Sequence, residues 1–136
     1  LEIRTSISYN NVPVKIIGTH GGFIGKDGAT QSGTQDISLM TSLPNFEVFQ
    51  PCSPIETIKI MDYVIKSNKP SYLRICRNNV GEVFNKNYKF VPGKPIQLID
   101  SKTNIIISSG PLIFNCYEAI KILSKKKINV GLVNIN

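Results

Sequence analysis

A short β-rich run that leads directly into a glycine-rich loop is the feature that most limits what this chain can fold into. The run is Val14–Thr19, and the segment that follows it, His20–Gln35, reads HGGFIGKDGATQSGTQ. Glycines allow positive φ angles and a close approach of the backbone to a bound molecule, although a glycine-rich turn can also be a simple connection. Because ligands of open α/β sheets bind at the carboxyl ends of the strands, this order predicts a binding loop at a sheet edge.

The rest of the sequence alternates helix and strand patterns, which predicts an α/β fold with parallel strands. Strands are expected over 46–50, 72–76, 103–108 and 130–135. Helices are expected over 34–43, from the capping box Ser53–Glu56 up to Asn68, and over 112–126. The second helix carries Ile55, Ile58, Met61 and Ile65 on one face. The segment 79–101 reads as a polar linker with a small antiparallel excursion around Pro92 and Gly93.

Composition favours a cytoplasmic α/β protein. Hydrophobic residues make up 41% of the chain, no apolar run is long enough to span a membrane, and the visible start carries no signal peptide, so no membrane role is expected. Cys52, Cys76 and Cys116 are odd in number and unclustered, and they lie in or beside apolar runs. We therefore expect buried free thiols and neither a disulfide nor a metal site.

The net charge of +7 raises the alternative of a nucleic-acid-binding protein, for which Lys125–Lys127 is the best evidence. These lysines close a helix in which Ile113, Ile120 and Leu123 form an apolar stripe. Cations in a last turn interact favourably with the helix dipole, so a solvated helix end explains them without nucleic acid. A modest positive field would also attract sugar phosphates.

Two stretches of the chain resemble a known enzyme family. The string VKIIGTHGGFIGKDGATQSGTQDISLMTSLPNFEVFQPCSPIE, followed by SYLRICRN, resembles the pyrimidine-binding domain of transketolases, most closely the separate carboxyl-terminal subunit of split bacterial and archaeal transketolases. The matching features are the Thr-His that ends the first strand, the G-x-DG-x-T loop, the D-I-x-L-M helix, the L-P-N-x-x-V strand entry and the Arg after the last strand. A weaker match resumes at Phe90 with FVPGKPIQLID and NIIISSGPLIFNCYEAIKIL.

The resemblance implies a domain organisation. Residues 1–80 would be part of a parallel-sheet, thiamine-diphosphate-binding domain of the pyrimidine type, 81–102 a linker, and 103–136 the start of a Rossmann-like α/β carboxyl-terminal domain. The chain starts at Leu1, its first four residues read as the tail of a helix, and it stops after a single βαβ pattern. We therefore expect a fragment of a larger enzyme, poorly soluble unless a partner covers its apolar surface.

The resemblance also implies roles for three residues. His20, at the strand end, would contact the phosphate of a sugar phosphate, whereas by itself it could simply cap a turn. Asp27 would read a substrate hydroxyl, and its alternative is an Asx turn, for which Asp-Gly is a common sequence. Arg77 would make a forked contact with phosphate, and its alternative is a surface salt bridge.

Gln31 is the main departure from the family pattern. The family ordinarily has Thr-His-Gln after the DG turn, with that His contacting the reacting end of the donor, whereas this chain has Thr30-Gln31-Ser32. A glutamine can still hydrogen-bond a carbonyl oxygen, but it cannot become a cation or carry a proton near neutral pH. We therefore expect a relative with an altered donor or acceptor sugar.

The cofactor implied by the family is thiamine diphosphate with Mg²⁺. The glutamate that activates the cofactor is expected upstream of Leu1, because neither Glu2 nor Glu47 sits in a matching motif. The diphosphate and the metal would bind a domain or subunit outside this chain, which would work as a homodimer or as a heterotetramer with an amino-terminal transketolase subunit. Alone, the chain is expected to be catalytically inert.

Three functions follow from these observations. The first is a part of a transketolase-like transferase that moves a two-carbon ketol unit between sugar phosphates. The second keeps the fold and cofactor but changes the reaction, toward a deoxyxylulose-phosphate synthase or the β subunit of a 2-oxo acid dehydrogenase; His20 and Arg77 argue against the dehydrogenase. The third is a noncatalytic assembly or binding module.

Overall fold

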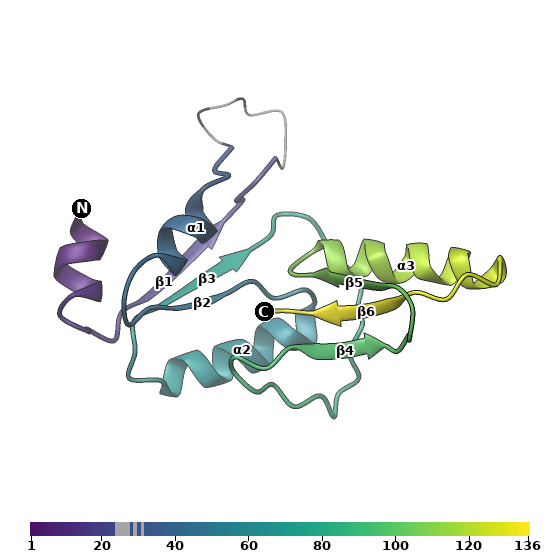
Figure 1. The fold of residues 1–136 in the computed structure, drawn as a ribbon. Coiled ribbons are helices and arrows are strands. Elements are labelled where there is room, and N and C mark those ends of the chain that lie inside the picture. The colour runs from purple at the N-terminus through teal and green to yellow at the C-terminus, as the bar shows by residue number, and fades with distance from the viewer. Residues whose placement is uncertain (24–27, 29, 31) are drawn as a thin grey trace. The chain divides into compact units, whose positions relative to one another are not determined.

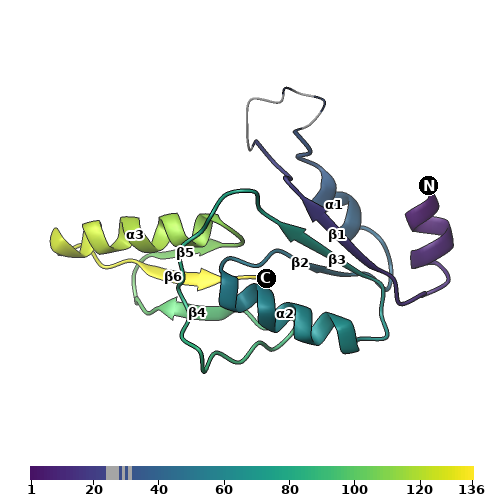
Figure 2. The same ribbon diagram turned by 180° about the vertical axis from the view of Figure 1, so that it is seen from behind.

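The computed structural model describes residues 1–23, 28, 30 and 32–136, and it confirms the α/β fold with parallel strands (Figures 1 and 2). The chain divides into two compact units. Unit 1 consists of residues 1–50 and 60–79, and unit 2 consists of residues 51–59 and 80–136. The domain limits expected from the sequence stay a prediction. None of the helices in the described ranges is long and apolar enough to cross a membrane.

Unit 1 is built on a parallel sheet of three strands, with β3 between β1 and β2 (Figure 1). Its elements in chain order are the π-helix η1 (Ile3–Ser8), β1 (Lys15–Thr19), α1 (Asp36–Thr41), β2 (Glu47–Phe49) and β3 (Ser71–Ile75). In the register, Thr19 pairs with Ile75 and Phe49 pairs with Leu73. The predicted helix at the start is therefore present but extends to Ser8, and the predicted strands are confirmed within a residue or two.

Helix α2 (Pro54–Lys66) begins in unit 2 and ends in unit 1. The sequence placed its apolar face on Ile55, Ile58, Met61 and Ile65, but Ile58 and Ile65 are 60% and 68% exposed. The side that is buried carries Ile60 and Val64. The helix has apolar residues on two sides, so periodicity alone could not decide which of them packs against the protein.

Polar side chains fasten the end of α2 to the start of the unit 1 sheet. The ammonium group of Lys15 donates to the carbonyl oxygens of Ser67 and Lys69, at 2.7 and 2.6 Å. The carboxylate of Glu47 accepts hydrogen bonds from the Tyr63 hydroxyl at 2.6 Å and from the Ser67 hydroxyl at 2.8 Å. Glu47 thus has a structural use in this sheet, in keeping with its lack of a cofactor motif.

Unit 2 contains a mixed sheet of three strands, with β6 between β4 and β5. Its elements are β4 (Ile96–Ile99), β5 (Ile105–Ser108), α3 (Leu112–Lys125) and β6 (Gly131–Asn134). Strands β5 and β6 are parallel, as the predicted βαβ crossover requires, and β4 runs antiparallel to β6. The antiparallel element in the segment read as a linker is therefore β4 itself, which lies after Pro92 and Gly93 and pairs with a strand far along the chain.

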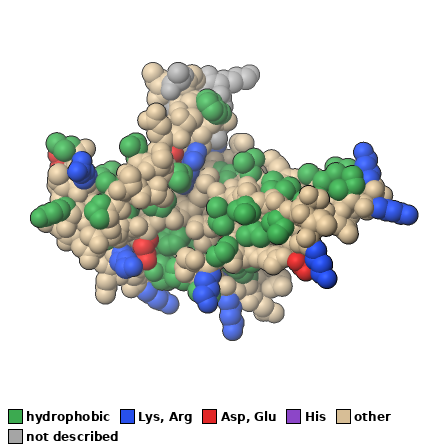
Figure 3. All heavy atoms as spheres, in the orientation of Figure 1, with side chains coloured by type: hydrophobic (Ala, Val, Ile, Leu, Met, Phe, Trp, Pro, Cys, Tyr) green, Lys and Arg blue, Asp and Glu red, His purple; other side chains and the backbone are tan. Residues whose placement is uncertain are grey.

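One face of the unit 2 sheet is covered by α3. Two residues of the predicted apolar stripe, Ile113 and Ile120, are buried with Cys52 and Leu132, whereas the third, Leu123, is partly exposed. On β5, the alternate residues Ile105 and Ile107 are 53% and 65% exposed, and hydrophobic side chains gather over this part of the surface in Figure 3. Exposed apolar surface of this kind was expected from the sequence.

The predicted capping box of α2 is the centre of a buried polar cluster in unit 2. The Ser53 hydroxyl accepts from the Glu56 N–H at 3.3 Å, and Glu56 Oε2 accepts from the Cys52 N–H at 2.8 Å. Three side chains that are distant in sequence donate to Glu56 Oε1: Tyr88 at 3.1 Å, Asn134 at 2.8 Å and Asn136 at 2.9 Å. Glu56 is fully buried, so these bonds replace its hydration.

The cluster also raises the pKa values of two neighbouring groups, the Cys52 thiol and the Tyr88 hydroxyl. Burial, followed by the charge of Glu56 and a hydrogen bond to it, raises the pKa of the Cys52 thiol well above its usual range. The same causes raise the pKa of the Tyr88 hydroxyl. All three cysteines are free, as expected, but only Cys52 is buried; Cys76 and Cys116 are partly exposed.

Candidate functional site

His20 lies directly after β1 with its backbone in the left-handed region, at a φ of 64°. Such a conformation is uncommon for residues other than glycine, and it costs roughly 1–3 kcal/mol, which other interactions must offset. One hydrogen bond that holds it runs from the His20 N–H to the carbonyl oxygen of Ile75, at 3.2 Å. The side chain of His20 is exposed, so its imidazole is available to a ligand.

Arg77 reaches the same edge of the sheet as His20. It follows β3 by two residues, and β3 is the strand to which β1 is paired in parallel. Because Thr19 lies opposite Ile75 in the register, His20 and Arg77 both emerge beyond the carboxyl ends of two adjacent strands. This is the part of a parallel sheet at which ligands bind, and the sequence predicted that both residues would lie there.

The glycine-rich loop is closed at its base by a backbone hydrogen bond of 2.6 Å from the Gly22 N–H to the carbonyl oxygen of Gly33. Gly22 has a φ of 90°, so the predicted need for glycine is met at this position. The other two predicted site residues, Asp27 and Gln31, lie outside the described residues. Their assignment to the site stays a prediction.

A polar cluster beneath the loop was not predicted as part of the site. Arg74 Nε of β3 lies 3.4 Å from Asp36 Oδ2, at the first residue of α1, and the two side chains are only 15% and 20% exposed. The Tyr72 hydroxyl donates to the same Asp36 oxygen at 2.8 Å. Burial, the hydrogen bond to Asp36 and the charge of Asp36 raise the pKa of Tyr72 to about 12, against the opposing effect of Arg74.

The guanidinium of Arg74 also supports the backbone of the loop. A Cβ atom added at Gly21 would collide with this guanidinium, and one added at Gly22 would lie 2.8 Å from Arg74 Nη2. A side chain at Gly21 would therefore require the Arg74 guanidinium to move. A signal for this contact was present in the sequence, because the charged Arg74 stands between the apolar residues Leu73 and Ile75 of a predicted strand.

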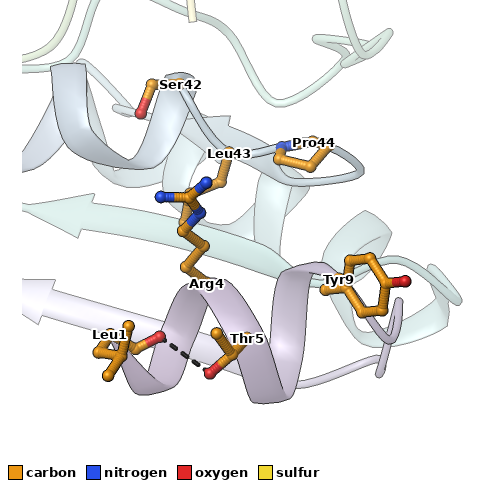
Figure 4. A pocket seen from close by; sticks show the side chains of 7 residues that line it. All are labelled: Leu1, Arg4, Thr5, Tyr9, Ser42, Leu43 and Pro44. Carbon is orange, nitrogen blue, oxygen red and sulfur yellow. Dashed lines mark hydrogen bonds between the residues drawn. The ribbon is translucent and has the colours of Figure 1, made fainter.

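Unit 1 contains a hollow that none of these residues lines. Its volume is about 750 Å³, and it is lined by Leu1, Arg4, Thr5, Tyr9, Ser42, Leu43 and Pro44 (Figure 4). Within it, the Thr5 hydroxyl donates to the carbonyl oxygen of Leu1 at 3.2 Å, and the Arg4 side chain extends from η1 toward Leu43. Neither His20 nor Arg77 lines this hollow, and we assign it no part in the site.

Residues 2–82 match the family of the transketolase pyrimidine binding domain, which is more than half of the chain. The chain belongs to this family. It is 30% identical, over 98% of its length, to one subunit of an apulose-4-phosphate transketolase from Actinobacillus succinogenes. It is also 30% identical, over 98% of its length, to a 1-deoxy-D-xylulose-5-phosphate synthase from Prochlorococcus marinus. The predicted family is therefore confirmed.

A solved structure is similar in fold as well as in sequence. It is that of a split gene transketolase, inactive beta4 tetramer, and it shares 34% identity with 98% of this chain at a TM-score of 0.89. The chain spans 43% of that structure, 43% of the apulose-4-phosphate transketolase subunit and 22% of the synthase. It therefore represents less than half the length of the relatives it matches.

Proposed function

We propose that this chain is part of a thiamine-diphosphate-dependent, transketolase-like transferase that moves a two-carbon ketol unit between sugar phosphates. The observation that carries the proposal is the position of His20 and Arg77 beyond the ends of β1 and β3, in a chain of the transketolase family. An imidazole and a guanidinium at one sheet edge suit a phosphate, which the guanidinium can bind through two parallel hydrogen bonds.

Asp27 and Gln31 complete the proposed substrate site. Asp27 would accept a hydrogen bond from a substrate hydroxyl, so that a sugar with the wrong configuration leaves this acceptor unpaired. Gln31, in place of the family histidine, would hydrogen-bond the reacting end of the donor without moving a proton. We connect this change with an unusual sugar, and a relative named for apulose 4-phosphate makes that sugar phosphate a specific candidate.

Thiamine diphosphate, when bound, would supply the carbon nucleophile for the transfer. Among the described residues, no group of three or more His, Cys, Asp or Glu is arranged to hold a metal ion. Mg²⁺ and the diphosphate would therefore bind another domain or subunit. The activating glutamate would lie in a segment preceding Leu1. Assembly with an amino-terminal transketolase subunit, or as a homodimer, would complete the enzyme, and this chain alone would be inert.

The test uses the complete protein with its partner subunit, thiamine diphosphate and Mg²⁺. Product formation is measured from xylulose 5-phosphate or apulose 4-phosphate as the ketose donor, each with ribose 5-phosphate or glyceraldehyde 3-phosphate as the aldose acceptor, and each with and without cofactor. We expect cofactor-dependent two-carbon transfer with at least one donor. His20→Ala and Arg77→Ala should each raise KM for the phosphorylated sugar roughly tenfold or more, with a smaller effect on the unphosphorylated sugar. Lys66→Ala, at the end of α2, serves as the control for loss of one positive charge.

The second candidate is a deoxyxylulose-phosphate synthase activity, which is favoured by the 30% identity to the Prochlorococcus marinus enzyme. Turnover of pyruvate with glyceraldehyde 3-phosphate, without transfer from either ketose phosphate, would select it and reject the transketolase proposal. Gln31→His tests the role of Gln31: an unchanged substrate profile would contradict its link to an unusual sugar. Absence of turnover with every pair, despite measured cofactor binding, would favour an assembly module.

A further inference from the structure

Arg74 contacts both ends of the glycine-rich loop. Its guanidinium lies against Gly21 and Gly22, where the chain enters the loop after His20. The same guanidinium is paired with Asp36, which lies three residues after Gly33, where the chain leaves the loop. Since the loop base is also closed by the hydrogen bond from Gly22 to Gly33, one side chain of the central strand supports the whole base of the loop.

Stability alone is a poor explanation for this arrangement. A largely buried ion pair loses hydration that its mutual attraction only partly restores, and apolar residues of similar volume often serve the fold as well or better. Asp36 Oδ1 is in addition buried without a hydrogen-bond partner among the described residues, which is a further cost. The cluster lies beside His20, which is exposed and has a left-handed backbone conformation. A role in positioning His20 explains the cost of the cluster better than stability does.

The backbone of His20 rests on the same strand. The residue before it pairs with Ile75 in the sheet, and the His20 N–H itself donates to the carbonyl oxygen of Ile75, the residue after Arg74. The residue after His20 is Gly21, which packs on the Arg74 side chain. A displacement of the Arg74 side chain would therefore act on the backbone next to His20.

We propose that Arg74 and Asp36 are positioning residues that hold His20 in the place where it and Arg77 bind the substrate phosphate. This rests on the proposed function of those two residues. Asp36 fixes the Arg74 guanidinium beneath Gly21, with Tyr72 as a second donor to the same Asp36 oxygen. Arg74 does not touch the phosphate in this account; it sets the geometry in which His20 does.

A simple effect of charge makes the opposite prediction for one variant. Asp36→Asn removes a negative charge near the site, so a pure field effect would strengthen the binding of an anion. If Asp36 instead acts by holding Arg74 in place, Asp36→Asn should weaken the binding of the anion. Arg74→Lys keeps the charge but loses the planar fork that packs beneath Gly21, and so should also weaken binding.

The experiment uses the complete protein with its partner subunit and isotope-labelled histidine. The His20 imidazole signal is identified as the one that disappears in His20→Gln, and inorganic phosphate is then titrated. We expect the dissociation constant for phosphate to rise about tenfold in Arg74→Met and about threefold in Asp36→Asn, each because the contact geometry is lost. Lys66→Met, which removes a distant cation, should leave the constant within about twofold.

A second readout needs no ligand. The His20 signal of the phosphate-free protein should shift in Arg74→Met and Asp36→Asn and stay unchanged in Lys66→Met. Stronger phosphate binding by Asp36→Asn, or an unshifted His20 signal in both variants, would overturn the positioning role. If the unmodified protein shows no phosphate effect at His20, the proposed phosphate-binding role of His20 fails, and the ligand-free shifts still decide the positioning role. Should Arg74→Met not fold, Arg74→Lys and Asp36→Asn give the same decision.

Discussion

Asn134 Nδ2 donates a 2.8 Å hydrogen bond to Glu56 Oε1 across 78 positions of sequence, and neither side chain is exposed to solvent. This bond joins the first turn of α2 to the end of β6 within unit 2. Tyr88 and Asn136 donate to the same oxygen. The capping carboxylate of α2 is thus the common acceptor for two distant segments, one at Tyr88 and one at residues 134–136.

Loss of the Glu56 carboxylate should be strongly destabilising. Glu56→Ala leaves four donors without their acceptor in a buried place, and we expect the free energy of unfolding to fall by about 3–5 kcal/mol. Glu56→Gln keeps the shape of the side chain, but its amide N–H₂ group faces groups that also donate hydrogen bonds. The free energy of unfolding should fall less in this variant, by about 1–3 kcal/mol. Equilibrium unfolding in urea measures both.

Glu118→Gln is the matched control for this change. Glu118 pairs with Lys121 at 2.7 Å on α3, and about half of each side chain is exposed, so its loss should change the free energy of unfolding by less than about 0.5 kcal/mol. Equal effects of Glu56→Gln and Glu118→Gln would contradict the role of the buried cluster.

Gly21→Ala should be destabilising because of Arg74 in particular. The added methyl group would collide with the guanidinium and force it to move, at a cost of about 1–3 kcal/mol. In the background of Arg74→Ala the same substitution should cost much less, so a double-mutant cycle should show a coupling energy between the two positions. Urea unfolding of the two single variants and the double variant gives this energy.

Gly33→Ala serves as the control, because no described atom lies within 4 Å of a Cβ built at that position. It should show no coupling to Arg74→Ala. Additive effects of Gly21→Ala and Arg74→Ala would mean that the contact between the loop and Arg74 is not formed in solution.

Tyr72 should make stability fall at high pH. Its pKa is raised from the ordinary value of 10 to about 12 in the folded protein, so the folded state binds more protons than the unfolded state between these values. The stabilisation is complete below pH 10 and is lost as the pH rises toward 12, at no more than about 1.4 kcal/mol per pH unit. Urea unfolding from pH 8.5 upward, compared with Tyr72→Phe, isolates this contribution. Identical slopes for the two proteins would refute it.

Cys52 should react with thiol reagents much more slowly than the other two cysteines. It is fully buried, and burial together with the charge of Glu56 raises its pKa, so little thiolate forms. At pH 8 we expect Cys76 and Cys116, which are partly exposed, to be labelled first, and Cys52 to be labelled at least about tenfold more slowly. Mass spectrometry of peptides after timed labelling assigns each site. Fast labelling of Cys52, with Cys52→Ala as the control, would contradict its burial.

Much of the fold could be predicted because its signals are local. The strand before the glycine loop, the capping box before α2 and the stripe on α3 each depend on residues close in sequence, and each is present. Strand β4 was not predicted as a strand, because its pairing depends on β6, which comes more than thirty positions later. The buried face of α2 was misjudged because Ile60 and Val64 compete with an equally apolar stripe that faces solvent.

The sequence also predicted only part of the candidate site. The place of His20 and Arg77 followed from the rule that parallel strands end at a common edge, together with the family resemblance. Arg74 and Asp36 were not predicted as part of the site. They are 38 positions apart in the sequence, and they form an ion pair only in the folded sheet, in which β3 pairs with β1.

By itself, the sequence determined the family, the α/β class and the chemical types of residue available at the sheet edge. These depend on motifs, glycine and proline positions, and short-range periodicity, all of which are local properties of the chain. The tertiary structure alone decided which side of α2 is buried, which acceptor satisfies Tyr88 and Asn134, and what lies beneath Gly21. Those outcomes depend on contacts between distant segments, whose free energies arise only when the whole chain packs.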